Sequence, residues 1–296
     1  MSAPPERRDV APPADAAPLG IVAGGGSLPL AVADAVSRRG RPVVMFSMRG
    51  WAEPAAGRHP HHWIAVGQLG RLFRLARREG CRDLVFIGAL TRPAISQIRL
   101  DWTTFRLLPR LLRAFRGGDD RLLSGVGGIF EDHGFRLVGA HEVAPEILAP
   151  AGPLGRHSPG ERERRDIDVA LGLLAAMGPY DVGQCAAVAD GHVLAVEAAE
   201  GTDHMLDRVA ALRREGRLHS AAGVGVVVKA PKPGQDRRFD LPSVGPQTVE
   251  GVARAGLAGL AIVAGATVVA EADRVVRLAD EHGLFVIGIA PREDAR

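Results

Sequence analysis

The sequence is short of cysteine, of aromatic residues and of long apolar runs, and each shortage excludes a class of protein. Its two cysteines, Cys81 and Cys185, lie far apart and belong to no metal-binding motif. This spacing excludes a disulfide scaffold and a zinc site, and it favours a reducing compartment. The most apolar stretch, residues 255–270, is broken by glycines and falls short of the roughly 20 apolar residues that a membrane-spanning helix needs.

The amino-terminal residues 1–18 are rich in Pro and Ala and contain no apolar core of a signal peptide. Such a composition buries little apolar surface, so we expect a disordered tail. Without a predicted span or signal, the sequence predicts a cytoplasmic protein, and peripheral contact with a membrane surface stays open.

Length and composition indicate a globular protein of two domains. The 296 residues exceed the roughly 100–200 of one typical domain. Because aromatics make up only 4% of the chain, the core must be built from Val, Leu, Ile and Ala. The net charge of +3 comes almost wholly from Arg interspersed with acids, without a block of like charge. Nucleic-acid binding is therefore unsupported, whereas weak attraction to an anionic substrate or membrane surface fits.

Short apolar runs alternate with helical patterns through the first half of the chain. We expect strands at residues 19–23, 42–47, 63–66, 84–87 and 135–138, and helices at 30–40 and 69–79. This alternation predicts a parallel sheet, and we assign residues 19–145 to a Rossmann-like α/β domain. The histidines before the third strand are expected in a loop, because no second pair of metal ligands accompanies them: His59, His61 and His62.

The turn Gly24-Gly25-Gly26-Ser27 follows the first strand and precedes a helix. A strand, a glycine turn and a helix start can offer backbone N–H groups to an anion, although a tight βα turn explains the glycines equally well. The turn is neither a dinucleotide fingerprint nor a Walker loop. An oxidoreductase is further disfavoured because Ser47 to Arg49, and no acid, end the second strand. Another basic residue, Arg92, follows the strand at 84–87.

An apolar stripe with helical spacing runs through residues 102–115, interrupted by Pro109. Its members are Trp102, Phe105, Leu108, Leu111, Leu112 and Phe115. Core packing is the expected role, and a groove for an apolar ligand is the alternative. Asp119 or Asp120 is expected to cap the next helix.

A Pro- and Gly-rich stretch at 144–164 marks the domain boundary, and residues 146–296 read as a second α/β domain. Asp190-Gly191 predicts a type I′ turn between two alternating runs, hence a β-hairpin over 185–197. Beyond it, Thr202 or Asp203 is expected to cap a helix that ends at Gly216. The neighbouring acids, Glu197 and Glu200 with Asp203, suggest a further role beside a cationic loop. Helices are also expected at 167–177, 248–255 and 271–282, and strands at 260–263 and 284–289.

The loop 229–245 follows a β-branched run at 224–228 that reads as a buried strand. Ligands of open α/β sheets bind at such carboxyl ends. The loop combines cations with carboxylates, which suits a phosphate with a metal. The charged residues are Lys229, Lys232, Asp236, Arg237, Arg238 and Asp240. A solvated surface loop whose charges pair with one another is the alternative.

These motifs occur in an order that resembles the LpxI family of UDP-2,3-diacylglucosamine diphosphatases. They are Ala23 to Pro29, Arg92-Pro93, Glu197 to Asp203, the loop 229–245 and residues 255–262. The resemblance covers residues 19–289. It implies a two-domain cytoplasmic enzyme of lipid A synthesis. This enzyme would hydrolyse UDP-2,3-diacylglucosamine to 2,3-diacylglucosamine 1-phosphate and UMP, with Mg²⁺ and with its substrate between the domains.

Under this resemblance, Asp240 and Asp236 are the candidates to hold Mg²⁺ or orient water, and Asp240 is favoured because Phe239 and Leu241 flank it. Lys229, with the two aspartates, makes up the candidate catalytic set. The candidate substrate-binding residues are Gly24, Gly25, Gly26, Ser27, Arg92, Thr202, Asp203, Lys232, Gln235 and Arg237. A non-catalytic protein that binds nucleotide-sugars or lipids is the alternative. A homodimer is compatible with the sequence, and no nucleic-acid partner is expected.

Overall fold

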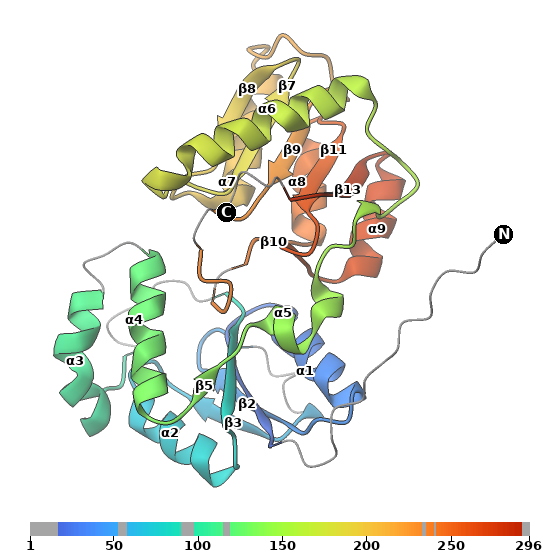
Figure 1. The fold of residues 1–296 in the computed structure, drawn as a ribbon. Helices are drawn as coiled ribbons and strands as arrows, with labels where there is room; N and C mark the ends of the chain where they lie inside the picture. Colours follow the sequence, from blue (N-terminus) through green and yellow to red (C-terminus); the bar gives the residue numbers. More distant parts are fainter. Residues whose placement is uncertain are drawn as a thin grey trace. The chain divides into compact units, whose positions relative to one another are not determined.

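The computed structural model describes residues 17–52, 58–89, 98–114, 119–232, 235–239 and 241–291. Among the helices in these ranges, none combines the length and the apolarity that crossing a membrane requires. The chain is α/β and divides into two compact units, one holding most of the chain up to Ala144 and the other running from Pro145 (Figure 1).

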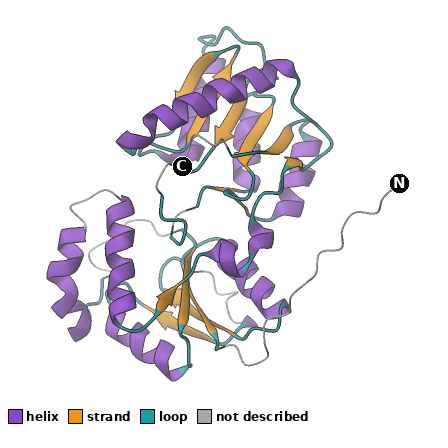
Figure 2. Ribbon diagram, viewed as in Figure 1, coloured by secondary structure: helices purple, strands orange, loops and turns teal. Residues whose placement is uncertain are grey.

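The N-terminal unit contains a parallel sheet in the order β3-β2-β1-β4-β5, as expected for this half. Its strands are β1 (Leu19–Ala23), β2 (Val43–Met48), β3 (His61–Ile64), β4 (Asp83–Ile87) and β5 (Arg136–Leu137). Its helices are α1 (Leu28–Arg38), α2 (Leu69–Arg78), α3 (Trp102–Ala114), α4 (Asp119–Asp132) and α5 (Ala140–Val143). α1 and α5 lie on one side of the sheet, and α2 and α4 lie on the other (Figures 1 and 2). The strand order reverses between β1 and β4, the position where such sheets usually place a ligand.

The core of this unit combines aliphatic strands with an unexpected group of phenylalanines. β1 and β2 are buried throughout, which explains their continuous apolar sequence. Phe73 of α2 contacts the rings of Phe130 and Phe135 at centroid distances of 5.0 and 5.7 Å, and Phe86 of β4 lies 4.9 Å from Phe130. Four of the chain's nine phenylalanines therefore form one cluster where α2, α4 and β4 meet.

The C-terminal unit is built on a mixed sheet in the order β6-β13-β11-β9-β7-β8, in which β9, β11 and β13 are parallel. Its strands are β6 (Gly152–Pro153), β7 (Cys185–Ala189), β8 (His192–Val196), β9 (Val226–Lys229), β11 (Gly259–Val263) and β13 (Phe285–Ile289). A separate parallel pair joins β10 (Ser243–Val244) to β12 (Val268–Val269). The helices are the 3₁₀ turns η3 (Pro145–Ile147) and η4 (Gly178–Tyr180), α6 (Glu161–Met177), α7 (Gly201–Arg214), α8 (Pro246–Arg254) and α9 (Ala272–Glu281).

Alternation along the strands divides this core into two layers. Val226 and Val228 of β9 pack with Ile167 and Leu174 of α6 on one face of the sheet. Val227 belongs to the other layer, with side chains of α7, α8 and α9. Figure 1 shows α6 across one face of the sheet. Because successive strand residues face opposite sides, the next residue, Lys229, points toward the α7 layer.

The predicted hairpin is confirmed in detail. Asp190 and Gly191 both have positive φ, 56° and 74°, as a type I′ turn requires. The buried carboxylate of Asp166 in α6 accepts hydrogen bonds from the backbone amides of both turn residues, at 3.1 and 2.7 Å. This anchor fixes the turn against α6, which begins at Glu161, six residues earlier than the sequence pattern indicated.

Two local expectations were wrong. His61 and His62 lie within β3 and not in a loop, and His62 forms a 2.9 Å bond with Glu79, which satisfies its polar ring. The helical stripe of α3 is not a core face: Trp102 and Phe105 are 72% and 54% exposed, whereas Leu108 and Leu111 are half-buried and Phe115 lies outside the described residues. α3 continues past Pro109, and a buried Thr104 occupies the inward face instead.

The glycine turn after β1 is fixed to the end of β4. Gly25 and Ala89 exchange backbone hydrogen bonds of 2.8 and 3.0 Å, and the Gly24 amide donates to Ile87. Gly88 has φ +102°, and a Cβ there would lie 2.8 Å from the Gly25 carbonyl oxygen. Glycine is required at position 88 for both reasons.

We therefore expect Gly88→Ala to cost about 2–4 kcal/mol of unfolding free energy, the sum of backbone strain and overpacking. Gly40→Ala is the matched control, because Gly40 also has positive φ (+83°) but has open space around its Cβ position. It should cost about 1–2 kcal/mol from strain alone. Urea denaturation of both variants measures the difference, and equal losses would refute the close-approach argument.

Candidate functional site

The carboxyl end of β9 is where the C-terminal unit gathers its candidate residues. β7 runs antiparallel to β9, with Cys185 opposite Lys229, and β8 returns so that Val196 lies opposite Ala186. The residue after β8, Glu197, is therefore at the same edge, and its amide donates a 2.8 Å bond to the Cys185 carbonyl.

Lys229, Thr202 and Glu197 form a buried hydrogen-bonded chain at this edge. The Lys229 ammonium donates to Thr202 Oγ1 at 2.8 Å, and the Thr202 hydroxyl donates to Glu197 Oε1 at 2.8 Å. Lys229 is 7% exposed and Glu197 is 8% exposed. A buried ammonium is costly unless it is hydrogen-bonded and compensated. Glu197 supplies the opposite charge through the threonine, so the three residues depend on one another.

The surroundings of this chain include a second polar side chain and an inert thiol. The backbone N–H of Gln184 donates to Glu197 Oε2 at 3.3 Å. Gln184 Oε1 is buried, and the described residues offer it no hydrogen-bond donor. In native proteins water or a ligand usually satisfies such an acceptor. Burial raises the pKa of the neighbouring Cys185 thiol to about 12, which excludes a thiolate nucleophile.

Several charges of loop 229–245 pair with acids, as expected for a solvated surface loop. Lys232 is ion-paired with Asp181, and Arg238 donates hydrogen bonds to both carboxylate oxygens of Asp236. Arg237 differs, since its guanidinium donates to the Gly265 carbonyl at 2.6 Å and not to a carboxylate among the described residues. Arg237 is exposed just beyond the end of β11, so it is the loop cation best suited to meet an anion.

Within loop 229–245, the buried side chain of Gln235 accepts a 3.1 Å hydrogen bond from the backbone amide of Lys232. The chain's two lysines, Lys229 and Lys232, are both in this loop, and every other basic side chain apart from histidine is arginine. Lysine carries a compact, strongly hydrated charge, so the presence of both lysines in one loop distinguishes this loop from the rest of the chain.

The metal-binding expectation has limited support from the side chains present. Asp236 gives both of its oxygens to Arg238, whose hydrogen bond lowers the pKa of the carboxyl below its usual value. In this arrangement Asp236 does not fit as a metal ligand. The part of the chain that the structure describes holds no group of three or more His, Cys, Asp or Glu side chains suited to a metal ion. Asp240 lies outside the described residues.

The remaining candidates are placed as follows. Thr202 and Asp203 lie in the first turn of α7 and do not cap it, because Glu200 holds the cap position. The expectation of a Thr202 or Asp203 cap was therefore wrong. Asp203 is exposed, and Glu200 pairs with Arg208 at 2.8 Å, so these acids do not converge with Glu197. In the N-terminal unit, Ser27 precedes α1 without a side-chain cap bond, and Arg92 lies outside the described residues.

The glycine turn offers fewer amides to an anion than its sequence suggested. The N–H groups of Gly24 and Gly25 already donate to Ile87 and Ala89. Gly26 has φ +89° and open space around its Cβ position, so it marks the accessible part of the turn. The close contacts of a tight turn explain why positions 24 and 25 are glycine. Among the three glycines of the turn, Gly26 is the one that has no close neighbour at its Cβ position.

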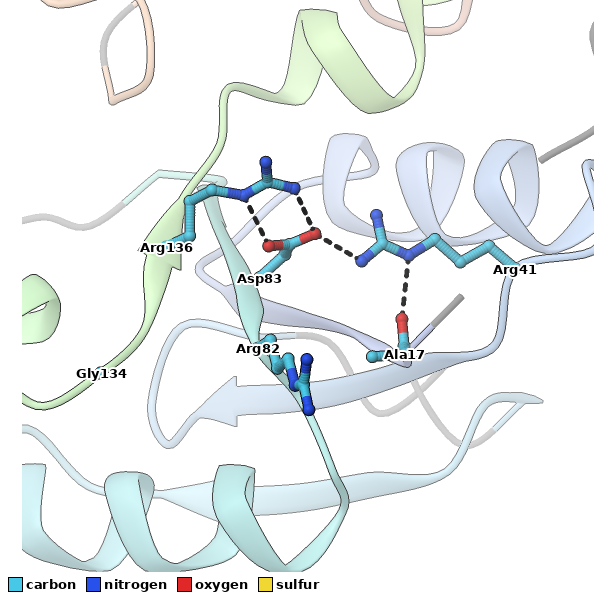
Figure 3. Close-up of a pocket in the computed structure, with 6 residues that line it drawn as sticks. All are labelled: Ala17, Arg41, Arg82, Asp83, Gly134 and Arg136. Carbon is cyan, nitrogen blue, oxygen red and sulfur yellow. Dashed lines mark hydrogen bonds and ion pairs between the residues drawn. The ribbon is translucent and has the colours of Figure 1, made fainter. Parts of the chain in front are cut away.

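A depression lined by three arginines lies at the amino-terminal edge of the N-terminal sheet, opposite the glycine turn (Figure 3). It is lined by Ala17, Arg41, Arg82, Asp83, Gly134 and Arg136. Arg136 bonds both oxygens of Asp83 at 2.8 and 2.9 Å, and Arg41 adds a 2.7 Å bond. Arg82 points away from this group (Figure 3). The ion pairs tie β4 to β5 and to the start of β2, which is a structural role far from the strand ends that carry this unit's candidate residues.

By its fold and site, the chain is a two-unit α/β protein with a cationic loop after β9, a strand of a mixed sheet. The model of the LpxI N-terminal domain matches residues 18–147, and that of the LpxI C-terminal domain matches residues 150–287. The chain belongs to the LpxI family, as the motif order indicated.

A relative from Caulobacter vibrioides, the UDP-2,3-diacylglucosamine pyrophosphatase LpxI, is 43% identical over 275 residues, covering 93% of this chain and 98% of the relative. A solved structure of UDP-glucose-4-epimerase from Stenotrophomonas maltophila, with bound NAD and formylated UDP-arabinopyranose, covers 95% of both chains at 14% identity. Its TM-score of 0.29 is too low to carry any argument.

We expect Asp83→Asn to lower the unfolding free energy at pH 7 by about 1–2 kcal/mol, because the largely buried Arg41 loses the negative charge that it pairs with. The loss at Arg136 should be small, because its side chain is exposed and solvent screens its charge. Hydrogen bonding from Arg136 lowers the pKa of Asp83 from its ordinary 3.8. The stabilisation is therefore present above that value and is lost as pH falls through the lower folded-state pKa. Urea denaturation should show a gap at pH 7 that narrows in acid.

Asp132→Asn is the matched control for this prediction, since its ion pair with Arg110 joins side chains that are 58% and 43% exposed. It should change stability little at any pH. A pH-independent loss in Asp83→Asn would show that the ion pair is not the source of the effect.

Proposed function

We propose that the chain hydrolyses the diphosphate bond of UDP-2,3-diacylglucosamine, giving 2,3-diacylglucosamine 1-phosphate and UMP, as a step of lipid A biosynthesis. The observation that carries the proposal is the full-length correspondence with the Caulobacter pyrophosphatase. The cationic loop at the carboxyl end of β9 is compatible with it, because an anionic diphosphate needs positive charge around its oxygens.

In the proposed reaction, water bonds to the phosphorus on the sugar side, and the bridging oxygen leaves with UMP. The water protons pass to solvent. Arg237 is the residue best placed to bind phosphoryl oxygens, since its charge is not offset by a carboxylate among the described residues. Lys229 adds a second positive charge, held in position by Thr202 and Glu197. Hydrolysis in ¹⁸O-water should label the sugar phosphate under this proposal.

Mg²⁺ dependence is part of the proposal and rests on Asp240. When bound, Mg²⁺ would neutralise charge on the diphosphate. Asp236 is ion-paired with Arg238, so it would bind Mg²⁺ only if that ion pair broke. We likewise propose that the substrate contacts both domains, that Gly26 and Ser27 are among its contacts, and that the protein works in the cytoplasm.

A non-catalytic protein that binds nucleotide-sugars remains the second candidate. The pairing of Asp236 with Arg238 favours it, because this pairing removes one of the two carboxylates that could orient water. Such a protein would bind UDP-sugars without metal-dependent hydrolysis.

Asp240→Ala should abolish UMP release from UDP-2,3-diacylglucosamine while leaving substrate binding largely intact, because it removes the group that orients water or metal and keeps the cations. UMP release is measured with Mg²⁺ and with a chelator, and binding by calorimetry. Asp273→Ala, an exposed acid in the first turn of α9, is the control. Undiminished turnover in Asp240→Ala would remove the assignment. Binding without hydrolysis in the wild type would favour the second candidate.

Thr202→Val should lower kcat about 10–100-fold, because a hydrogen bond to a charged group contributes about 1.5–3 kcal/mol. Valine keeps the shape of threonine but leaves the Lys229 ammonium without its acceptor. Thr202→Ser keeps the hydroxyl and should retain most activity. Steady-state kinetics and thermal unfolding on the same samples separate positioning from folding. Wild-type kcat in Thr202→Val would exclude this role.

A further inference from the structure

Exposed apolar side chains are concentrated in one short segment of the N-terminal unit. In the part of the chain that the structure describes, nine large hydrophobic residues are exposed, and five of them lie within residues 98–112. They are Ile98, Leu100, Trp102, Phe105 and Leu112, with exposed fractions of 37%, 51%, 72%, 54% and 53%. We call this set the α3 patch. Single exposed apolar residues are ordinary, but a group of this kind marks an interaction surface.

The helical members of the α3 patch share one face. Trp102, Phe105 and Leu112 are separated by three and seven residues, so they form a stripe along α3, with exposed Pro109 between them. The rings of Trp102 and Phe105 are stacked at a centroid distance of 5.7 Å. α3 packs beside α2 at the edge of its unit (Figure 1).

The opposite face of α3 explains why the patch points outward. Asp101 accepts bonds from the amides of Thr104, at 2.8 Å, and Arg71 at the start of α2, at 2.9 Å. The buried Thr104 hydroxyl in turn accepts a 3.0 Å bond from the Leu69 amide. Burial alone would raise the pKa of Asp101, but these hydrogen bonds outweigh it and the pKa is lowered. This polar anchor fixes the rotation of α3.

The charges beside the α3 patch are predominantly positive. Residues 98–112 contain three arginines and one aspartate, and that aspartate is the anchor Asp101. Arg99 and Arg106 are exposed, and Arg106 is one helical turn from Trp102, next to the apolar stripe. Arg110 is ion-paired with Asp132. Exposed aromatic rings beside arginines match an interface of apolar lipid tails and anionic headgroups.

We propose that the α3 patch docks on an anionic membrane surface, with Trp102, Phe105 and Leu112 inserted among the lipids and Arg99 and Arg106 at the headgroups. The helix lies in the interface and does not span it. The proposal deepens the proposed function, since a substrate with two acyl chains resides in a bilayer. Its test is independent of that function, because it uses vesicles without substrate.

The experiment measures co-sedimentation of the full chain with vesicles of phosphatidylethanolamine and phosphatidylglycerol, and with vesicles of phosphatidylcholine alone. The wild type should bind the anionic vesicles, and salt should weaken the binding. Trp102→Ser with Phe105→Ser should reduce the bound fraction about tenfold or more. Tyr180→Ser, which removes a 79% exposed ring from the C-terminal unit, should leave it unchanged. Arg106→Glu should weaken only binding to the anionic vesicles.

Folding is checked by circular dichroism, and Arg106→Glu keeps the test decisive if the double variant unfolds. A wild type that stays in solution with both kinds of vesicle overturns the proposal, as does equal binding by wild type and Arg106→Glu. Light scattering that shows a dimer in the wild type and a monomer in the double variant, without vesicle binding, would assign the patch to a second copy of this chain. Hydrolysis of substrate in detergent micelles is measured separately and tests the proposed function alone.

Discussion

The burial of the Lys229 ammonium is the constraint on which the C-terminal unit depends. A cation that is only 7% exposed must have a compensating anion and an acceptor. Thr202 and Glu197 meet this need from two different elements, the start of α7 and the end of β8. The hairpin therefore has a purpose beyond its own stability, because it returns the chain to the edge where β9 ends. Moving any one of the three residues leaves a buried polar group unsatisfied.

The position of this ammonium follows from strand geometry. Val227 faces the α7 layer and Val228 faces α6, so the alternation assigns Lys229 to the α7 side. Acidic side chains offset the loop's Lys232 and Arg238. Among the loop residues that the structure describes, this leaves Arg237 as the exposed cation held by a carbonyl. Two kinds of positive charge thus result, one fixed and buried and the other available at the surface.

The sequence predicted most of the fold because its signals were local. The Asp190-Gly191 turn and the apolar runs that become strands depend on neighbours in the chain, and the turn was found where expected. The pairing of Glu197 with Lys229 joins residues 32 positions apart in the sequence. Charge type and spacing cannot show that a threonine joins them. Periodicity was right about the α3 stripe but gave no information on which face was buried, because the anchor on the other face is polar.

The contrast between α3 and α2 shows why periodicity failed to assign burial. α2 buries Leu72, Phe73 and Ala76, and its polar side faces outward. α3 has an equally clear apolar stripe, yet its rotation is fixed by Asp101 and Thr104 bonding to free amides at the start of α2. Unpaired N–H groups at a helix start are costly when buried. Satisfying them offsets part of the cost of leaving an apolar stripe in contact with water. A helix held in this way retains an apolar surface for another partner, and its arginines restrict that partner to a negatively charged one.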